Sequence, residues 1–179
     1  TPGARYGERM RALKAAIIPR MYHSSSVVLP DGKVLVAGSN TNNGYMYNAM
    51  FPTELRVERF LPPYLDNSVA RLRPSIVGAL TATEIHYGEK FVVTIKRDNQ
   101  AATKDYLSVT LYAPAFTTHG VSMNQRLVFL GVEKVSDELG NHAVRAIAPP
   151  KREVAPPGYY LMSVVRSKVP SASVWVRLS

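Results

Sequence analysis

Two short stretches of the chain carry side chains that could bind one metal ion. The first holds the adjacent pair Tyr22-His23, just after Pro19-Arg20-Met21. The second holds His119, about one hundred residues later, at a separation that only a folded chain could close. Imidazole suits copper, and a phenolate adds an oxygen ligand. Tyr22, His23 and His119 are therefore candidate ligands of one transition metal.

The local sequence restricts how these side chains could converge. Neighbours on a regular strand face opposite sides of a sheet, so Tyr22 and His23 need a bent segment to reach one metal. His119 falls between two predicted strands, in a loop, where functional residues are common. The plainer alternative stays open: Tyr22 stacks in a core, and His23 and His119 are ordinary loop histidines. His86 and His142 lie beside turn-forming residues and receive no role.

The sequence of the first third of the chain predicts strands that are not stable without further strands beside them. Residues 25–29 and 33–37 are rich in Val and Leu and are joined by Pro30-Asp31-Gly32, a turn sequence that predicts a hairpin. A further strand is predicted at residues 55–60. A two-stranded unit buries too little surface for stability. Residues 1–60 therefore need other strands beside them.

The rest of the chain predicts an antiparallel β-sandwich. Leu107, Val109 and Leu111 alternate with polar residues, as expected for a sheet with one buried face. Such spacing over many short segments is typical of an immunoglobulin-like sandwich. The predicted strands are residues 75–80, 91–96, 106–113, 126–135, 143–148, 159–166 and 172–178. Prolines at Pro62-Pro63 and Arg73-Pro74 place the boundary between the two units within residues 61–74.

Composition narrows the function classes. The chain has 179 residues, 22 Lys+Arg against 13 Asp+Glu, a formal charge of +9, and no cysteine. Disulfides and thiolate metal sites are excluded. The basic residues are scattered without interleaved aromatic residues, so the charge indicates a solvated basic surface and no nucleic-acid partner. No stretch approaches the roughly 18 apolar residues of a membrane span.

Four runs together resemble a known family. They are the stretches around Tyr22-His23 and His119, Asn40-Thr41-Asn42-Asn43-Gly44, and Pro52-Thr53-Glu54-Leu55-Arg56-Val57-Glu58. These runs resemble the carboxy-terminal part of the copper radical oxidases, the galactose oxidase and glyoxal oxidase family. The resemblance implies an all-β fold. Residues 1–61 would be strands of the last blade of a β-propeller, 62–74 a linker, and 75–179 an immunoglobulin-like, early-set β-sandwich.

The resemblance also implies a reaction and a copper cofactor. Members of this family oxidise an aldehyde or a primary alcohol and reduce O₂ to hydrogen peroxide. Tyr22, His23 and His119 would bind one copper ion, and Tyr22 would also take the substrate proton. The family's second cofactor, a radical tyrosine joined to a cysteine, is not encoded here. Trp175 would be a core residue of the sandwich rather than the family's stacking tryptophan.

The resemblance therefore indicates a fragment of a secreted oxidase, inactive alone, whose missing partner is the propeller of the same parent chain. The alternative from another class is a stand-alone immunoglobulin-like module that binds acidic cell-wall polysaccharide. That alternative predicts exposed aromatic side chains aligned on one strand face, for example Tyr87, Tyr106 and Tyr112. It leaves the Tyr22-His23 run unexplained.

Overall fold

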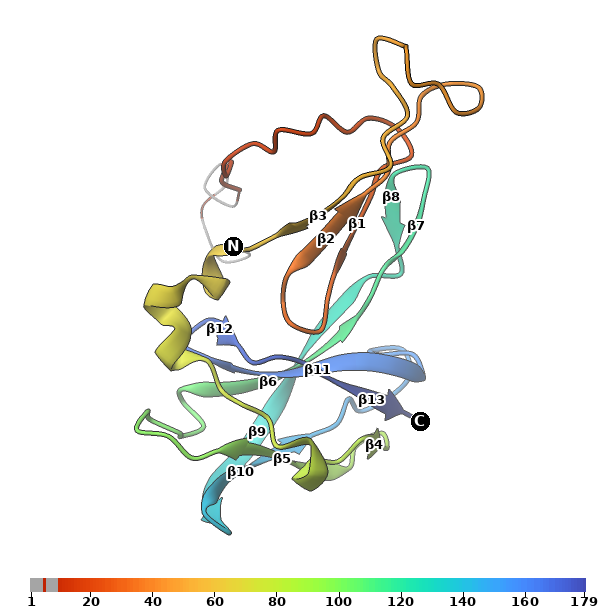
Figure 1. Ribbon diagram of the computed structural model, residues 1–179. Coiled ribbons are helices and arrows are strands. Elements are labelled where there is room, and N and C mark those ends of the chain that lie inside the picture. Colours follow the sequence, from red (N-terminus) through yellow and green to blue (C-terminus); the bar gives the residue numbers. More distant parts are fainter. Residues whose placement is uncertain (1–4, 6–9) are drawn as a thin grey trace.

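The computed structural model describes residue 5 and residues 10–179, and its regular structure is mostly β-strand (Figure 1). Residues 1–4 and 6–9 of the predicted first unit lie outside the described residues. Within the described part, no helix is long and apolar enough to cross a membrane. The all-β prediction is confirmed.

The predicted hairpin and the strand after it form a small antiparallel sheet, in the order β1-β2-β3. Its strands are β1 (Ser25–Val28), β2 (Val34–Ala37) and β3 (Val57–Phe60). Gly32 takes a φ of 86°, and its N–H donates to the carbonyl oxygen of Leu29 at 2.9 Å. The positive φ at Gly32 is the reason that a glycine closes this turn.

The sandwich is a continuous path of strands in the order β4-β13-β11-β6-β9-β10-β5, with β12 paired to β11. Strand β9 pairs with β6 through Arg126–Leu130 and with β10 through Gly131–Glu138, so it belongs to both layers. The strands are β4 (Glu84–Ile85), β5 (Lys90–Lys96), β6 (Leu107–Ala113), β9 (Arg126–Glu138), β10 (Asn141–Ile147), β11 (Gly158–Arg166), β12 (Val169–Pro170) and β13 (Val174–Leu178).

Alternating apolar residues supply the core between the layers, as the sequence predicted. Leu107, Val109 and Leu111 of β6 are buried, and they pack with inward-facing residues of the other strands. The other fully buried apolar members include Ile85, Val93, Ile95, Val144, Met162, Val164, Val176 and Leu178.

Three local predictions were wrong. Residues 75–80 form no strand: Ile76 makes one bridge to Ile95, and a 3₁₀ turn, η3, spans Gly78–Leu80. His142 is not in a turn but in β10, where it is 8% exposed and lies 2.6 Å from the Asp137 carboxylate. Trp175 is not a core residue, because half of its surface is exposed on the outer face of β13.

The segment between the two units fixes their relative position. Two 3₁₀ helices, η1 (Pro63–Leu65) and η2 (Asn67–Leu72), follow β3. The Tyr64 hydroxyl donates to the Gly32 carbonyl oxygen at 2.7 Å, and the Ser173 N–H donates to the Pro30 carbonyl oxygen at 2.7 Å. The β1–β2 turn is therefore held both by η1 and by the sandwich.

A hairpin that the sequence did not predict extends from the sandwich towards the small sheet. It consists of β7 (Phe116–Thr118) and β8 (Val121–Met123). Figure 1 shows it rising from the ends of β6 and β9 to lie alongside β1, which β7 contacts. The tip of this hairpin carries His119.

Candidate metal centre

Tyr22 and His23 lie on a tight turn immediately before β1. The Ser24 N–H donates to the Met21 carbonyl oxygen at 3.2 Å, and His23 takes a φ of 64°. This bend removes the strand alternation that would have separated the two side chains. Their ring centroids lie 3.8 Å apart. A left-handed conformation is uncommon for a residue other than glycine and often marks a functional position.

His119 occupies the tip of the β7–β8 hairpin. The strands are joined by the two residues His119 and Gly120, with φ values of 54° and 73°. Two consecutive positive φ values are those of a type I′ turn, which matches the twist of a two-residue hairpin. His119 therefore projects as far from the sandwich as this hairpin allows.

The fold brings the three predicted residues together. The ring centroid of His119 lies 6.1 Å from that of Tyr22 and 6.4 Å from that of His23. The two histidines come from different structural units, the small sheet and the sandwich hairpin. Tyr22 is 45% exposed, so its phenol is open to solvent.

The donor set suits copper. The Nδ1 atom of His23 lies 3.0 Å from the Asn40 carbonyl oxygen, which can only accept, so in the neutral ring Nδ1 carries the proton and the Nε2 lone pair is left for a metal. The Nδ1 atom of His119 lies 2.8 Å from the Thr118 hydroxyl oxygen. Two imidazoles and a phenol form a mixed nitrogen and oxygen set of the kind that binds copper(II). The third member of this set is a tyrosine: among residue 5 and residues 10–179, no group of three or more His, Cys, Asp and Glu side chains could hold a metal ion.

A buried arginine braces the turn from behind. The Arg20 side chain is 8% exposed and donates to Glu58 from Nη2 at 2.8 Å and from Nε at 3.1 Å. It also donates from Nη1 to the Gly38 carbonyl oxygen at 2.8 Å. The Met21 N–H donates to Ser39 Oγ at 2.8 Å. These bonds join the residues before Tyr22 to the end of β2 and to β3.

Glu54, in the loop just before β3, is ionised at neutral pH. The Arg56 guanidinium and backbone N–H donate to Glu54 and hold the pKa of that carboxyl at about 2. Glu54 in turn donates its backbone N–H to the Ser39 carbonyl oxygen at 2.8 Å. This backbone bond joins the two ends of the loop between β2 and β3.

The remaining histidines and the predicted aromatic row lie elsewhere. His86 is exposed, and its Nδ1 atom lies 2.9 Å from Ser179 Oγ. Tyr87 is half-buried and donates to the Ala155 carbonyl oxygen at 2.8 Å, whereas Tyr106 is exposed. Tyr87, packed against the core, is not part of an exposed aromatic row with Tyr106 and Tyr112.

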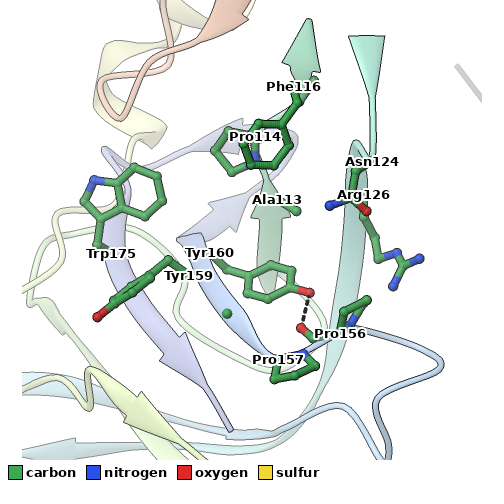
Figure 2. A pocket seen from close by; sticks show the side chains of 12 residues that line it. Ala113, Pro114, Phe116, Asn124, Arg126, Pro156, Pro157, Tyr159, Tyr160 and Trp175 are labelled. Carbon is green, nitrogen blue, oxygen red and sulfur yellow. Dashed lines mark hydrogen bonds between the residues drawn. The ribbon is translucent and has the colours of Figure 1, made fainter.

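A groove of about 460 Å³ opens at the base of the β7–β8 hairpin (Figure 2). Exposed rings of Phe116, Tyr159 and Trp175 line it, and the Tyr160 hydroxyl donates to the Pro156 carbonyl oxygen at 2.7 Å. None of the three candidate metal ligands lines this groove. It is separate from the candidate metal centre.

Comparisons with known proteins agree with the sequence motifs. The family described as galactose oxidase-like, early set domain, matches residues 73–178, and glyoxal oxidase N-terminus matches residues 1–64. The chain is 50% identical to aldehyde oxidase GLOX1 of Arabidopsis thaliana, and the match covers 99% of this chain and 29% of that protein. It is 40% identical to aldehyde oxidase GLOX of Vitis pseudoreticulata, over 99% of this chain and 33% of that protein.

More distant proteins share the fold. A galactose oxidase of Gibberella zeae is 32% identical, over 90% of this chain and 22% of that protein. A solved fungal alcohol oxidase in complex with copper superposes with a TM-score of 0.72 at 22% identity, over 93% of this chain and 32% of that one. The chain thus spans a third or less of the length of these relatives. Because the early-set family alone matches more than half of its residues, the chain belongs to the galactose oxidase-like family of copper radical oxidases.

Proposed function

We propose that this chain supplies three copper ligands, Tyr22, His23 and His119, to an oxidase of aldehydes or primary alcohols. The convergence of Tyr22-His23, from the small sheet, with His119, from the tip of the sandwich hairpin, is the observation that carries the proposal. The two residues at the tip of the β7–β8 hairpin are His119 and Gly120, so the side chain that this hairpin brings to the Tyr22-His23 turn is an imidazole. A metal ion shared by the three side chains would account for this convergence.

Each residue has a distinct part in the proposal. His23 and His119 hold copper through imidazole nitrogen, and Tyr22 adds its phenol oxygen. When bound, copper supplies the redox chemistry by which a substrate is oxidised and O₂ is reduced to hydrogen peroxide. Tyr22, half-exposed beside both imidazoles, accepts the proton that the substrate alcohol or hydrated aldehyde gives up. The names of the aldehyde oxidase relatives favour aldehydes over galactose as the substrate class.

The parent protein would contain more than the units described above. We propose that residues 1–61 are strands of the last blade of a β-propeller, that 62–74 are a linker, and that 75–179 are the early-set sandwich. The other blades would bring the radical tyrosine and its cysteine partner. Without them this chain binds copper and does not turn over substrate. Secretion of the parent is part of the same proposal.

Copper titration of three variants tests the proposal. His23→Ala and His119→Ala should each weaken Cu(II) binding by about 10-fold or more, because each removes one imidazole ligand. His86→Ala is the matched control, since it removes an exposed histidine outside the site and should leave the affinity unchanged. Equal affinities for all three variants and the unmodified chain would refute the proposed ligand set.

A further inference from the structure

Asn40 is bonded to both members of the Tyr22-His23 pair through its own backbone. Its N–H donates to the Tyr22 carbonyl oxygen at 2.8 Å, and its carbonyl oxygen accepts from His23 Nδ1 at 3.0 Å. The two bonds lie on either side of one residue. The conformation of Asn40 therefore controls both the turn that carries His23 and the direction of the His23 ring.

The side chain of Asn40 makes four hydrogen bonds that hold that conformation. Its Oδ1 atom accepts from the Asn42 N–H at 3.0 Å, from Asn42 Nδ2 at 3.3 Å and from Thr53 Oγ1 at 3.1 Å. Its Nδ2 atom donates to the Gly44 carbonyl oxygen at 2.9 Å. Thr53 is buried and accepts from the Met46 N–H at 2.9 Å. One amide thus ties together both ends of the loop between β2 and β3.

We infer that Asn40 is a positioning residue for His23: its side chain locks the loop so that its carbonyl oxygen holds the proton on Nδ1 and directs Nε2 towards His119 and Tyr22. This inference rests on the proposed function, because the His23 ring is positioned for copper binding. A partner on the other ring nitrogen of a metal-binding histidine fixes both its tautomer and its orientation. Among the described residues, no other hydrogen bond to a His23 ring nitrogen is found.

The sequence around Asn40 offers a matched set of variants. Asn40→Ala removes all four side-chain bonds, whereas Asn40→Asp keeps the acceptor oxygen and loses only the donor to Gly44. Asn43→Ala is the control, because Asn43 lies exposed in the same loop. If Asn40→Ala does not fold, Asn40→Asp still tests the inference, because loss of the Nδ1 tautomer in a variant that keeps the acceptor bonds would contradict it.

Two measurements decide the inference. Long-range ¹H–¹⁵N NMR of the metal-free chain should show His23 protonated at Nδ1 in the unmodified, Asn40→Asp and Asn43→Ala proteins, and a mixture of tautomers in Asn40→Ala. Cu(II) affinity should fall about 10-fold in Asn40→Ala and less than about 3-fold in Asn40→Asp. A purely structural loop residue would lower stability without changing the tautomer.

The outcomes separate this inference from the proposed function. If the unmodified chain binds copper through His23 and His119, and Asn40→Ala matches Asn43→Ala in tautomer and affinity, the inference is overturned and the proposed function stands. If no protein binds copper but Asn40→Ala alone loses the Nδ1 tautomer, Asn40 orients His23 and the copper proposal fails. An unmodified chain protonated at Nε2 of His23 overturns the inference directly.

Discussion

Gly38 is where the backbone packs most tightly behind His23, and substituting it should disturb the metal centre. Gly38 has a φ of 74°, and a Cβ atom built on it would lie 2.8 Å from the His23 carbonyl oxygen. The left-handed conformation costs an alanine about 1–2 kcal/mol. Overpacking against a backbone oxygen adds roughly 1–3 kcal/mol. Gly38→Ala should therefore destabilise the β1–β2 hairpin by about 2–5 kcal/mol.

Gly140→Ala is the matched control. Gly140 has the same φ of 74°, but nothing lies within 4 Å of its built Cβ, so only the conformational cost of about 1–2 kcal/mol applies. Amide hydrogen exchange across the β1–β2 and β9–β10 hairpins measures both losses, and Cu(II) titration measures the displacement of His23. We expect affinity to fall about 10-fold in Gly38→Ala and to hold in Gly140→Ala. If Gly38→Ala and Gly140→Ala lose the same amount of hydrogen-exchange protection in their hairpins and bind Cu(II) equally well, the packing argument is refuted.

Three further predictions concern the brace, the sandwich and the reaction. Arg20→Met should cost about 1–3 kcal/mol in urea unfolding, because it leaves the partly buried Glu58 carboxylate unpaired, and Glu58→Gln should cost less. Burial raises the pKa of Asp98, but the hydrogen bonds from the Arg166 guanidinium and the Gln100 N–H outweigh it and hold that pKa below its ordinary value. The contribution of the ionised Asp98 to the free energy of unfolding is therefore complete above about pH 4 and is lost as the pH falls further. Asp98→Asn should flatten the acid limb of a profile of stability against pH. The copper-loaded chain should yield no sustained peroxide with glyoxal-type aldehydes or galactose; steady production dependent on His119 would contradict the need for a separate radical tyrosine.

The sequence predicted most of the sandwich because burial there follows strand periodicity. Val176 and Leu178 alternate with Trp175 and Arg177, and the structure buries the first pair and exposes the second. The alternation predicts Trp175 on the outer face, whereas its large apolar ring favours the core, and the structure follows the alternation. Residues 75–80 look like a strand by their apolar composition, but the Leu80 N–H donates to the Val77 carbonyl oxygen and the Thr81 N–H to the Gly78 carbonyl oxygen, which closes a 3₁₀ turn. The Thr81 hydroxyl adds a further bond to the Val77 carbonyl oxygen.

The candidate site was identified by residue type, but its geometry was not. Nothing in the periodicity indicated the β7–β8 hairpin, although His119-Gly120 between two short polar–apolar stretches has the pattern of a two-residue turn. In the sequence Asn40 is distinguished only as part of the family-like run, because its role arises from hydrogen bonds to residues on both sides of β2. His142 was placed in a turn by Gly140-Asn141, while its pairing with Asp137 depends on the register of β9 and β10.

Electron paramagnetic resonance of the Cu(II)-loaded chain tests the central claim most directly. Hyperfine coupling to directly bound nitrogen counts the imidazole ligands. We expect two nitrogens in the unmodified chain, one in His23→Ala, one in His119→Ala and two in His86→Ala, with Tyr22→Phe changing the spectrum but not the nitrogen count. A spectrum that His119→Ala leaves unchanged would mean that the sandwich hairpin does not reach the metal, and would contradict the account.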